Sequence, residues 1–146
     1  MIKEKPDHHD AELVLKLYDL RREATMRQAR TWYAMKFNPD TIEDVAKAMG
    51  GADSASFRMV TSYWDMAASL VNNGAIDEQM FNDANGEHVI VLAKIAPFLE
   101  EYRKRMGNPN YLRQLEKLVM KMPNAHQALA SVRERFKQMA AAQAGR

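Results

Sequence analysis

Four histidines, His8, His9, His88 and His126, are the side chains in this sequence best suited to metal binding or acid–base chemistry. A helical metal site places two histidines, or a histidine and a carboxylate, about one turn apart on one face. His88 and His126 each stand alone on a predicted helix, and His8 and His9 are adjacent near the amino terminus. We therefore expect surface or helix-capping histidines and no metal site.

A second candidate is the segment 83–87, which looks like the start of a calcium-binding loop. Such a loop needs glycine at its sixth position and glutamate at its twelfth. Counted from Asp83, those positions hold His88 and Lys94. We interpret the segment as a turn.

The sequence carries no motif of a known enzyme chemistry. The sequence has no nucleophile elbow, P-loop, dinucleotide-binding fingerprint or metalloprotease motif. It has no cysteine, which excludes thiol catalysis and cysteine-ligated zinc. We predict a protein without catalytic residues or a cofactor, that is, not an enzyme.

The segment 41–50 is similar to the first helix and turn of a helix-turn-helix motif. The next helix would then offer Ser54, Ser56 and Arg58 to the major groove of DNA. Against this, Gly51 stands where an apolar residue is expected, and the following helix is long and carries Trp64. A helical corner is the simpler interpretation, and nucleic-acid binding through 41–58 is the alternative function.

Charge and hydropathy favour neither nucleic acid nor a membrane. The 21 basic and 19 acidic side chains give a net charge of +2, which gives no strong attraction to anionic partners. No run reaches the roughly 18 apolar residues of a membrane helix, and the first residues lack the apolar core of a signal peptide. We expect a cytoplasmic protein without membrane insertion.

Apolar residues recur at helical spacing through most of the chain, and no segment shows the alternation of a strand. The sequence therefore predicts one all-α domain over 1–146, with 1–9 and 140–146 frayed and about six to seven helices. Helix starts are expected at Asp7 or Asp10, Thr25, Thr41, Asp53 or Ser54, Asp77, Asn108 and Asn124. At one junction, Gly74 suits left-handed backbone angles, and Ile76 and Phe81 form a hydrophobic staple.

The most apolar stretch, from His88 to Arg103, contains Pro97. A helix that is apolar nearly all round belongs in the middle of a bundle. We predict a central helix over about 87–105, kinked where Pro97 removes a backbone hydrogen bond.

Several sequence features follow one another from Trp64 onward. The sequence LVNNG is followed by Gly74-x-Ile76-Asp77, then by the apolar helix with Pro97, Arg103 and the pair Tyr111-Leu112. From Met26 to about Met122 this arrangement resembles a bacterial family of small all-helical proteins known only as a domain of unknown function. The resemblance implies an all-α fold and a bacterial source, and it transfers no catalytic residue or ligand. Several members carry an amino-terminal membrane helix, which is not seen in this sequence.

The last helix carries Leu129, Val132, Phe136 and Met139 at a spacing of three and four residues. Such a seam packs either on its own core or on another subunit. These four residues are the candidate interface of a homo-oligomer, most simply a dimer. An unknown protein partner is the alternative. The sequence thus favours a protein-interaction or self-association module.

Overall fold

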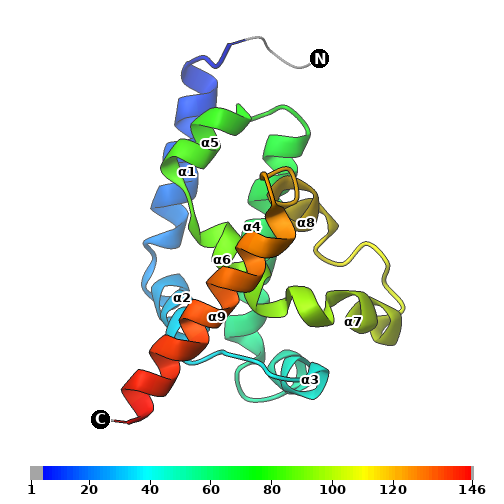
Figure 1. The fold of residues 1–146 in the computed structure, drawn as a ribbon. Coiled ribbons are helices and arrows are strands. Elements are labelled where there is room, and N and C mark those ends of the chain that lie inside the picture. Colours follow the sequence, from blue (N-terminus) through cyan, green and yellow to red (C-terminus); the bar gives the residue numbers. More distant parts are fainter. Residues whose placement is uncertain (1–4, 146) are drawn as a thin grey trace.

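The computed structural model describes residues 5–145, and within that range it contains helices and no strand. This confirms the all-α fold (Figure 1). The number of helices exceeds the expected six to seven, mainly because the segment 87–105 is divided. In order they are α1 (His8–Arg21), α2 (Ala24–Met35), α3 (Ile42–Gly50), α4 (Ser54–Asn72), α5 (Glu78–Ala84), α6 (Glu87–Ile95), the 3-10 helix η1 (Ala96–Phe98), α7 (Leu99–Met106), α8 (Arg113–Val119) and α9 (Ala125–Ala144).

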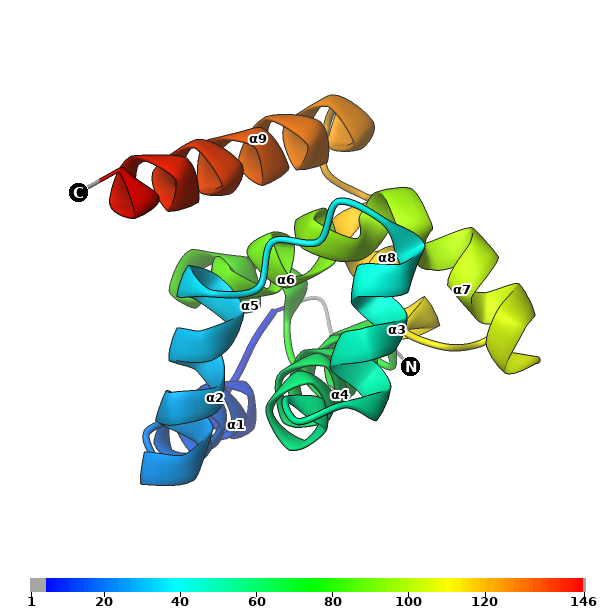
Figure 2. The ribbon, with the colours of Figure 1, turned by 90° about the horizontal axis from the view of Figure 1, so that it is seen from below.

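Two helices, α4 and α6, form the centre of the molecule. The helices α2, α3 and α8 pack against α4, and α9 lies along α6 (Figures 1 and 2). Phe57 and Trp64 of α4 and Leu92 and Ile95 of α6 are at most 1% exposed. The apolar stretch after His88 is central as predicted, but it shares that position with α4. Within residues 5–145 no helix is long and apolar enough to cross a membrane.

The predicted helix over 87–105 is interrupted at Pro97. The α-helical hydrogen bonds of α6 end at Ile95, η1 covers Ala96–Phe98, and α7 begins at Leu99. Proline has no N–H and its ring clashes with the preceding turn, so the chain tightens there into a 3-10 turn. The kink is confirmed, and the single continuous helix is corrected to two helices that meet at it.

Several predicted helix starts are confirmed. Thr41 and Asp44 form a capping box, and the Asp77 carboxylate accepts from the N–H of Met80 at 2.9 Å. Ile76 and Phe81 are both buried, as a hydrophobic staple requires, and Gly74 has a φ of 82°. Asp7 caps α1.

The starts of α2 and α9 differ from the expectation. The helix α2 begins at Ala24 with Glu23 as its N-cap, because the Glu23 carboxylate accepts from the N–H of Met26 at 3.0 Å. Thr25 is therefore inside the helix. Asn124 does precede α9, but it has a φ of 52° and its side chain makes no capping bond.

Buried polar contacts connect the central helices. The Lys94 ammonium in α6 donates to three carbonyls at the end of α2, those of Tyr33, Ala34 and Phe37, at 2.7 to 2.9 Å. These carbonyls have no helical partner, so the lysine satisfies them. Burial lowers the pKa of Lys94 to about 8, and the side chain is therefore still protonated at neutral pH.

The Glu87 carboxylate makes a second connection. It accepts from the Trp64 indole at 2.8 Å and from two nitrogens of the Arg30 guanidinium at 2.9 and 3.0 Å. One carboxylate thus joins α2, α4 and α6. The charge-assisted bonds fix the entry of α6, which has no side-chain cap of its own.

Candidate binding pocket beside the Arg103 network

A cavity of about 610 Å³ lies between α3, α4 and the segment 107–112. We call it the α4 pocket. Apolar side chains from three parts of the chain line it, those of Met49, Met59 and Leu112. Its polar lining includes Arg58, Asp65, Asn108, Asn110 and Tyr111. The lining thus combines apolar surface with polar groups at defined positions, and such polar groups are what orient a ligand in a binding site.

The segment 107–112 adopts an unusual backbone. Gly107 and Leu112 both have left-handed angles, with φ of 68° and 53°. For a side chain such as leucine this conformation costs on the order of 1–3 kcal/mol. Between them the Asn108 side chain accepts from the N–H of Asn110 at 3.1 Å, which closes a turn. Asn108 therefore caps a turn and not a helix, and α8 begins at Arg113, later than predicted.

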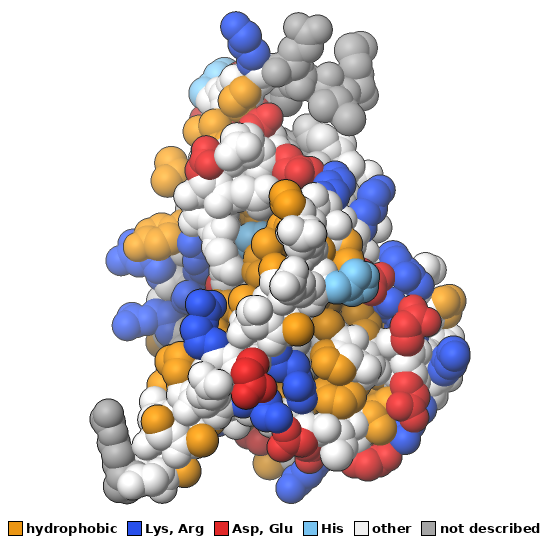
Figure 3. All heavy atoms as spheres, viewed as in Figure 1, with side chains coloured by type: hydrophobic (Ala, Val, Ile, Leu, Met, Phe, Trp, Pro, Cys, Tyr) orange, Lys and Arg blue, Asp and Glu red, His pale blue; other side chains and the backbone are white. Residues whose placement is uncertain are grey.

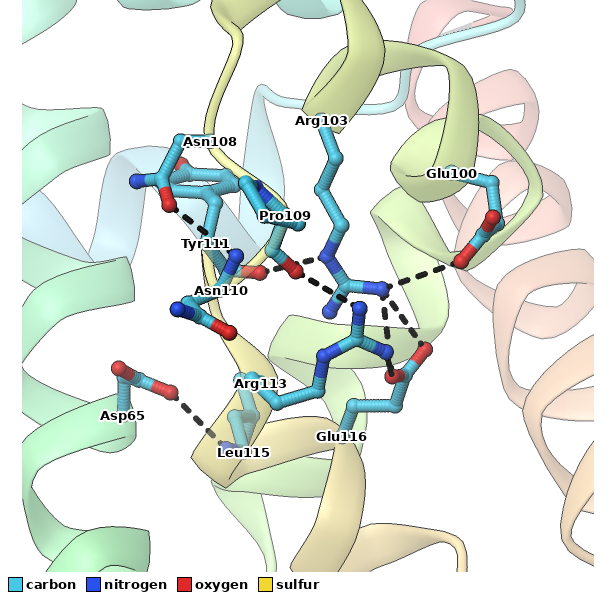
Figure 4. A network of polar contacts seen from close by, with 10 residues as sticks. All are labelled: Asp65, Glu100, Arg103, Asn108, Pro109, Asn110, Tyr111, Arg113, Leu115 and Glu116. Carbon is cyan, nitrogen blue, oxygen red and sulfur yellow. Dashed lines mark hydrogen bonds and ion pairs between the residues drawn. The ribbon is translucent and has the colours of Figure 1, made fainter.

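Arg103 of α7 bonds to the backbone of this segment. Its guanidinium is 3% exposed, and its Nε donates to the Tyr111 carbonyl at 2.8 Å (Figure 4). One terminal nitrogen donates to both carboxylate oxygens of Glu116, at 3.2 and 3.3 Å. The contact with Glu100 is longer, at 3.5 Å, and that carboxylate is 77% exposed. Glu116 is thus the main counter-ion of a buried arginine.

Arg113 and Asp65 make three further bonds in and beside this segment. Arg113 donates to the Pro109 carbonyl at 2.7 Å and to Glu116 at 3.0 Å (Figure 4). Asp65 of α4 accepts from the N–H of Leu115 at 2.9 Å, which satisfies an unpaired donor in the first turn of α8. The loop is therefore bonded to α7 and to α8, and α8 is bonded in turn to α4, which explains how the strained angle at Leu112 is maintained.

The side chains that face the pocket have unused hydrogen-bonding capacity. Arg58 is exposed, and it forms no ion pair with any residue between 5 and 145. The Asn110 amide points from the loop toward α4, where Asp65 lies (Figure 4). The Tyr111 hydroxyl is buried near Thr61 without a hydrogen bond of normal geometry. Burial raises the pKa of Tyr111, so the phenol stays protonated and serves as a neutral polar group.

The three residues proposed to contact nucleic acid do not all line the α4 pocket or lie on one face of α4. Arg58 lines the α4 pocket, whereas Ser54 and Ser56 are half-buried and lie outside its lining. Ser54 and Arg58 are four residues apart and share a face of α4, whereas Ser56 is two residues from each and does not share that face. In addition, α4 is a core helix, and its buried face from Phe57 to Val71 packs against its neighbours. Nucleic-acid binding through 41–58 stays a prediction, and the structure gives Arg58 a different set of neighbours.

The four residues proposed as an interface lie along α9. Leu129 is 5% exposed and belongs to the core, and Val132 packs against that core. Phe136 is half-buried, and its ring lies 4.8 Å from the Lys94 ammonium. Met139 alone of the four is largely exposed, at 43%. The seam therefore packs mainly within the chain.

The sequence reasoning missed most of the pocket. In the sequence, Arg103 and Tyr111 were notable only as part of the family resemblance. Asn108 was predicted only to cap a helix. A usable signal was present, because Gly107-Asn108-Pro109-Asn110 is a cluster of turn-forming residues. Which helix would face that turn was not visible in the sequence. Among the described residues no three His, Asp or Glu side chains are grouped as metal ligands.

These features define a small all-α protein with a pocket between a core helix and a rigid loop. A family model matches residues 6–122, which is most of the chain. The protein therefore belongs to the family described as Domain of unknown function (DUF4760). This confirms the resemblance to a family of unknown function and extends it to include α1. Comparison with curated proteins and with solved structures gave no significant match.

Proposed function

We propose that this protein is a non-catalytic interaction module that binds a segment of a partner protein in the α4 pocket. The observation that carries the proposal is the rigid 107–112 loop. The buried Arg103 and the bond from Arg113 to the Pro109 carbonyl hold it in a strained conformation along one side of the pocket. Strain that the surrounding structure maintains is typical of binding sites, because a preorganised site loses little entropy on binding.

The lining suggests the chemistry of the partner. Met49 and Met59 supply an adaptable apolar surface for one side chain. Arg58, which has no ion pair in the described chain, would pair with a carboxylate. The Asn108 and Asn110 amides suit the N–H and C=O groups of an extended backbone. We therefore infer a partner segment in which an acidic residue stands beside an apolar one.

A random peptide library displayed on phage tests the proposal. Selection against the wild-type protein should enrich peptides that combine an acidic and an apolar residue. Titration calorimetry with synthetic peptides then measures affinity. Replacing Arg58 by glutamate should weaken binding at least tenfold, because the carboxylate of the peptide then faces a like charge.

A matched control is Arg135→Glu, since Arg135 is also exposed and lies on α9, away from the pocket. This variant should bind the selected peptides as the wild type does. Failure to enrich any peptide would contradict the proposal. So would peptides that bind the wild type and Arg58→Glu equally.

Self-association through α9 is a separate proposal, supported by one observation. The carboxy-terminal end of α9 extends beyond the rest of the molecule and carries hydrophobic side chains (Figures 1 and 3). Met139 lies on this end, after Lys137, which pairs with Asp40 at 2.8 Å. If this end pairs with a second copy, light scattering will show a dimer that Met139→Glu dissociates. Met106→Glu, a similar change at 41% exposure on α7, is the control. A wild-type monomer at high micromolar concentration would refute the proposal.

A further inference from the structure

A second cavity, of about 390 Å³, lies between α5, α6 and α8 and is distinct from the α4 pocket. Its apolar walls are formed by Val89, Leu118, Val119 and Met122. At its edge Glu78 and Lys121 form an ion pair of 2.8 Å. The volume is within the range of small-molecule sites, roughly 300–1,000 Å³. The paired charges at the edge leave the cavity without a net charge.

Two polar side chains in the lining of this cavity each have one buried atom without a hydrogen-bond partner. Asn85 is 9% exposed and His88 is 3% exposed. The Asn85 Nδ2 donates to the Phe81 carbonyl at 3.0 Å, and this bond identifies Oδ1 as the free acceptor. The Nδ1 of His88 is also buried and unpaired. Buried polar atoms are nearly always paired, so two unpaired ones beside one cavity require an explanation.

The histidine is fixed in place and uncharged. Its ring packs against Phe81 at 5.0 Å and Trp64 at 5.8 Å between centroids, which restricts its rotation toward another partner. Burial lowers the pKa of His88 to about 4, against a smaller opposing effect of the Glu87 carboxylate. At neutral pH the imidazole therefore has one nitrogen able to accept a hydrogen bond.

We propose that this cavity binds a small, uncharged, mainly apolar molecule that donates an N–H or O–H hydrogen bond to Asn85 or His88. The apolar walls favour an apolar body, and the lack of net charge disfavours an ion. The free acceptor on Asn85 selects for a donor on the ligand. An aromatic N–H compound of the size of indole has these properties.

Indole and indene test the proposal on the wild-type protein, because they share size and shape and only indole carries the N–H donor. Binding is followed by chemical-shift changes in ¹H–¹⁵N correlation spectra. We expect saturable binding of indole, with shifts confined to α5, α6, α8 and the turn 120–123 that follows α8. Indene should bind at least roughly tenfold more weakly. It has no N–H donor, so the buried acceptors stay unpaired when it occupies the cavity.

Two variants locate the site. Val89→Phe fills the cavity from a half-buried position and should abolish indole binding. Asn110→Ala changes the α4 pocket and should leave indole binding unchanged. Absence of saturable indole binding, equal binding of indene, or shifts outside the three helices and the turn 120–123 would overturn the proposal. If Val89→Phe does not fold, the comparison of indole with indene on the wild type decides.

Discussion

Replacing His88 by glutamine is expected to make the stability of the protein less sensitive to acid. His88 is 3% exposed, and burial lowers its pKa from 6.5 to about 4. The unfolded chain therefore binds a proton on this residue more readily than the folded chain does. Above about pH 6.5 both states hold neutral His88 and no stability is lost. As the pH falls from 6.5 toward 4, protonation stabilises the unfolded state and the free energy of unfolding decreases.

The size of the effect follows from the two pKa values. At pH 5 the imidazole is mostly charged in the unfolded chain and mostly neutral in the folded one. Linkage then gives a loss of about 2 kcal/mol of unfolding free energy between pH 8 and pH 5, and about 3 kcal/mol by pH 4. Glutamine carries no charge in this range, so His88→Gln lacks this contribution.

Urea unfolding followed by circular dichroism at pH 8, 6.5 and 5 measures the effect. Between pH 8 and pH 5 the His88→Gln variant should lose about 2 kcal/mol less than the wild type. His126 is exposed, and His126→Gln should keep the wild-type pH dependence. The reasoning is refuted if all three proteins lose the same stability, or if an NMR titration places the pKa of His88 near 6.5.

Two further predictions concern the 107–112 loop, and both are measured by urea unfolding at pH 7. Arg103→Lys should lower the free energy of unfolding by about 3 kcal/mol, because lysine cannot reproduce the bonds to Tyr111 and Glu116. Glu100→Gln should change it by less than about 0.5 kcal/mol, since Glu100 is largely exposed; equal effects would contradict the role of the buried pair. Gly107→Ala should cost about 1–2 kcal/mol through its φ of 68°, although open space surrounds the site. Gly86→Ala, equally open but with a φ of −134°, is the control, and an equal loss there would exclude the backbone explanation.

The helical fold and many of the helix ends could be predicted from the sequence. Helical spacing of apolar residues depends only on local geometry. The buried face of α4 and the apolar character of α6 could therefore be predicted. The elbow at Gly74, Ile76 and Phe81 and the kink at Pro97 were readable for the same reason. Each depends on backbone angles or contacts between residues close in the chain.

The two cavities and the contacts around them could not be predicted without the tertiary structure. Asp65 meets the N–H of Leu115, fifty residues later, and Arg103 meets the Tyr111 carbonyl across a turn whose shape the sequence did not specify. The cavity beside His88 likewise exists only because α5, α6 and α8 come together. Local patterns set which face of a helix is apolar, whereas the choice of neighbour depends on how all the helices pack at once. Arg103 shows the difference: in the sequence it is only one residue of the family resemblance, whereas packing buries it and bonds it to the 107–112 loop.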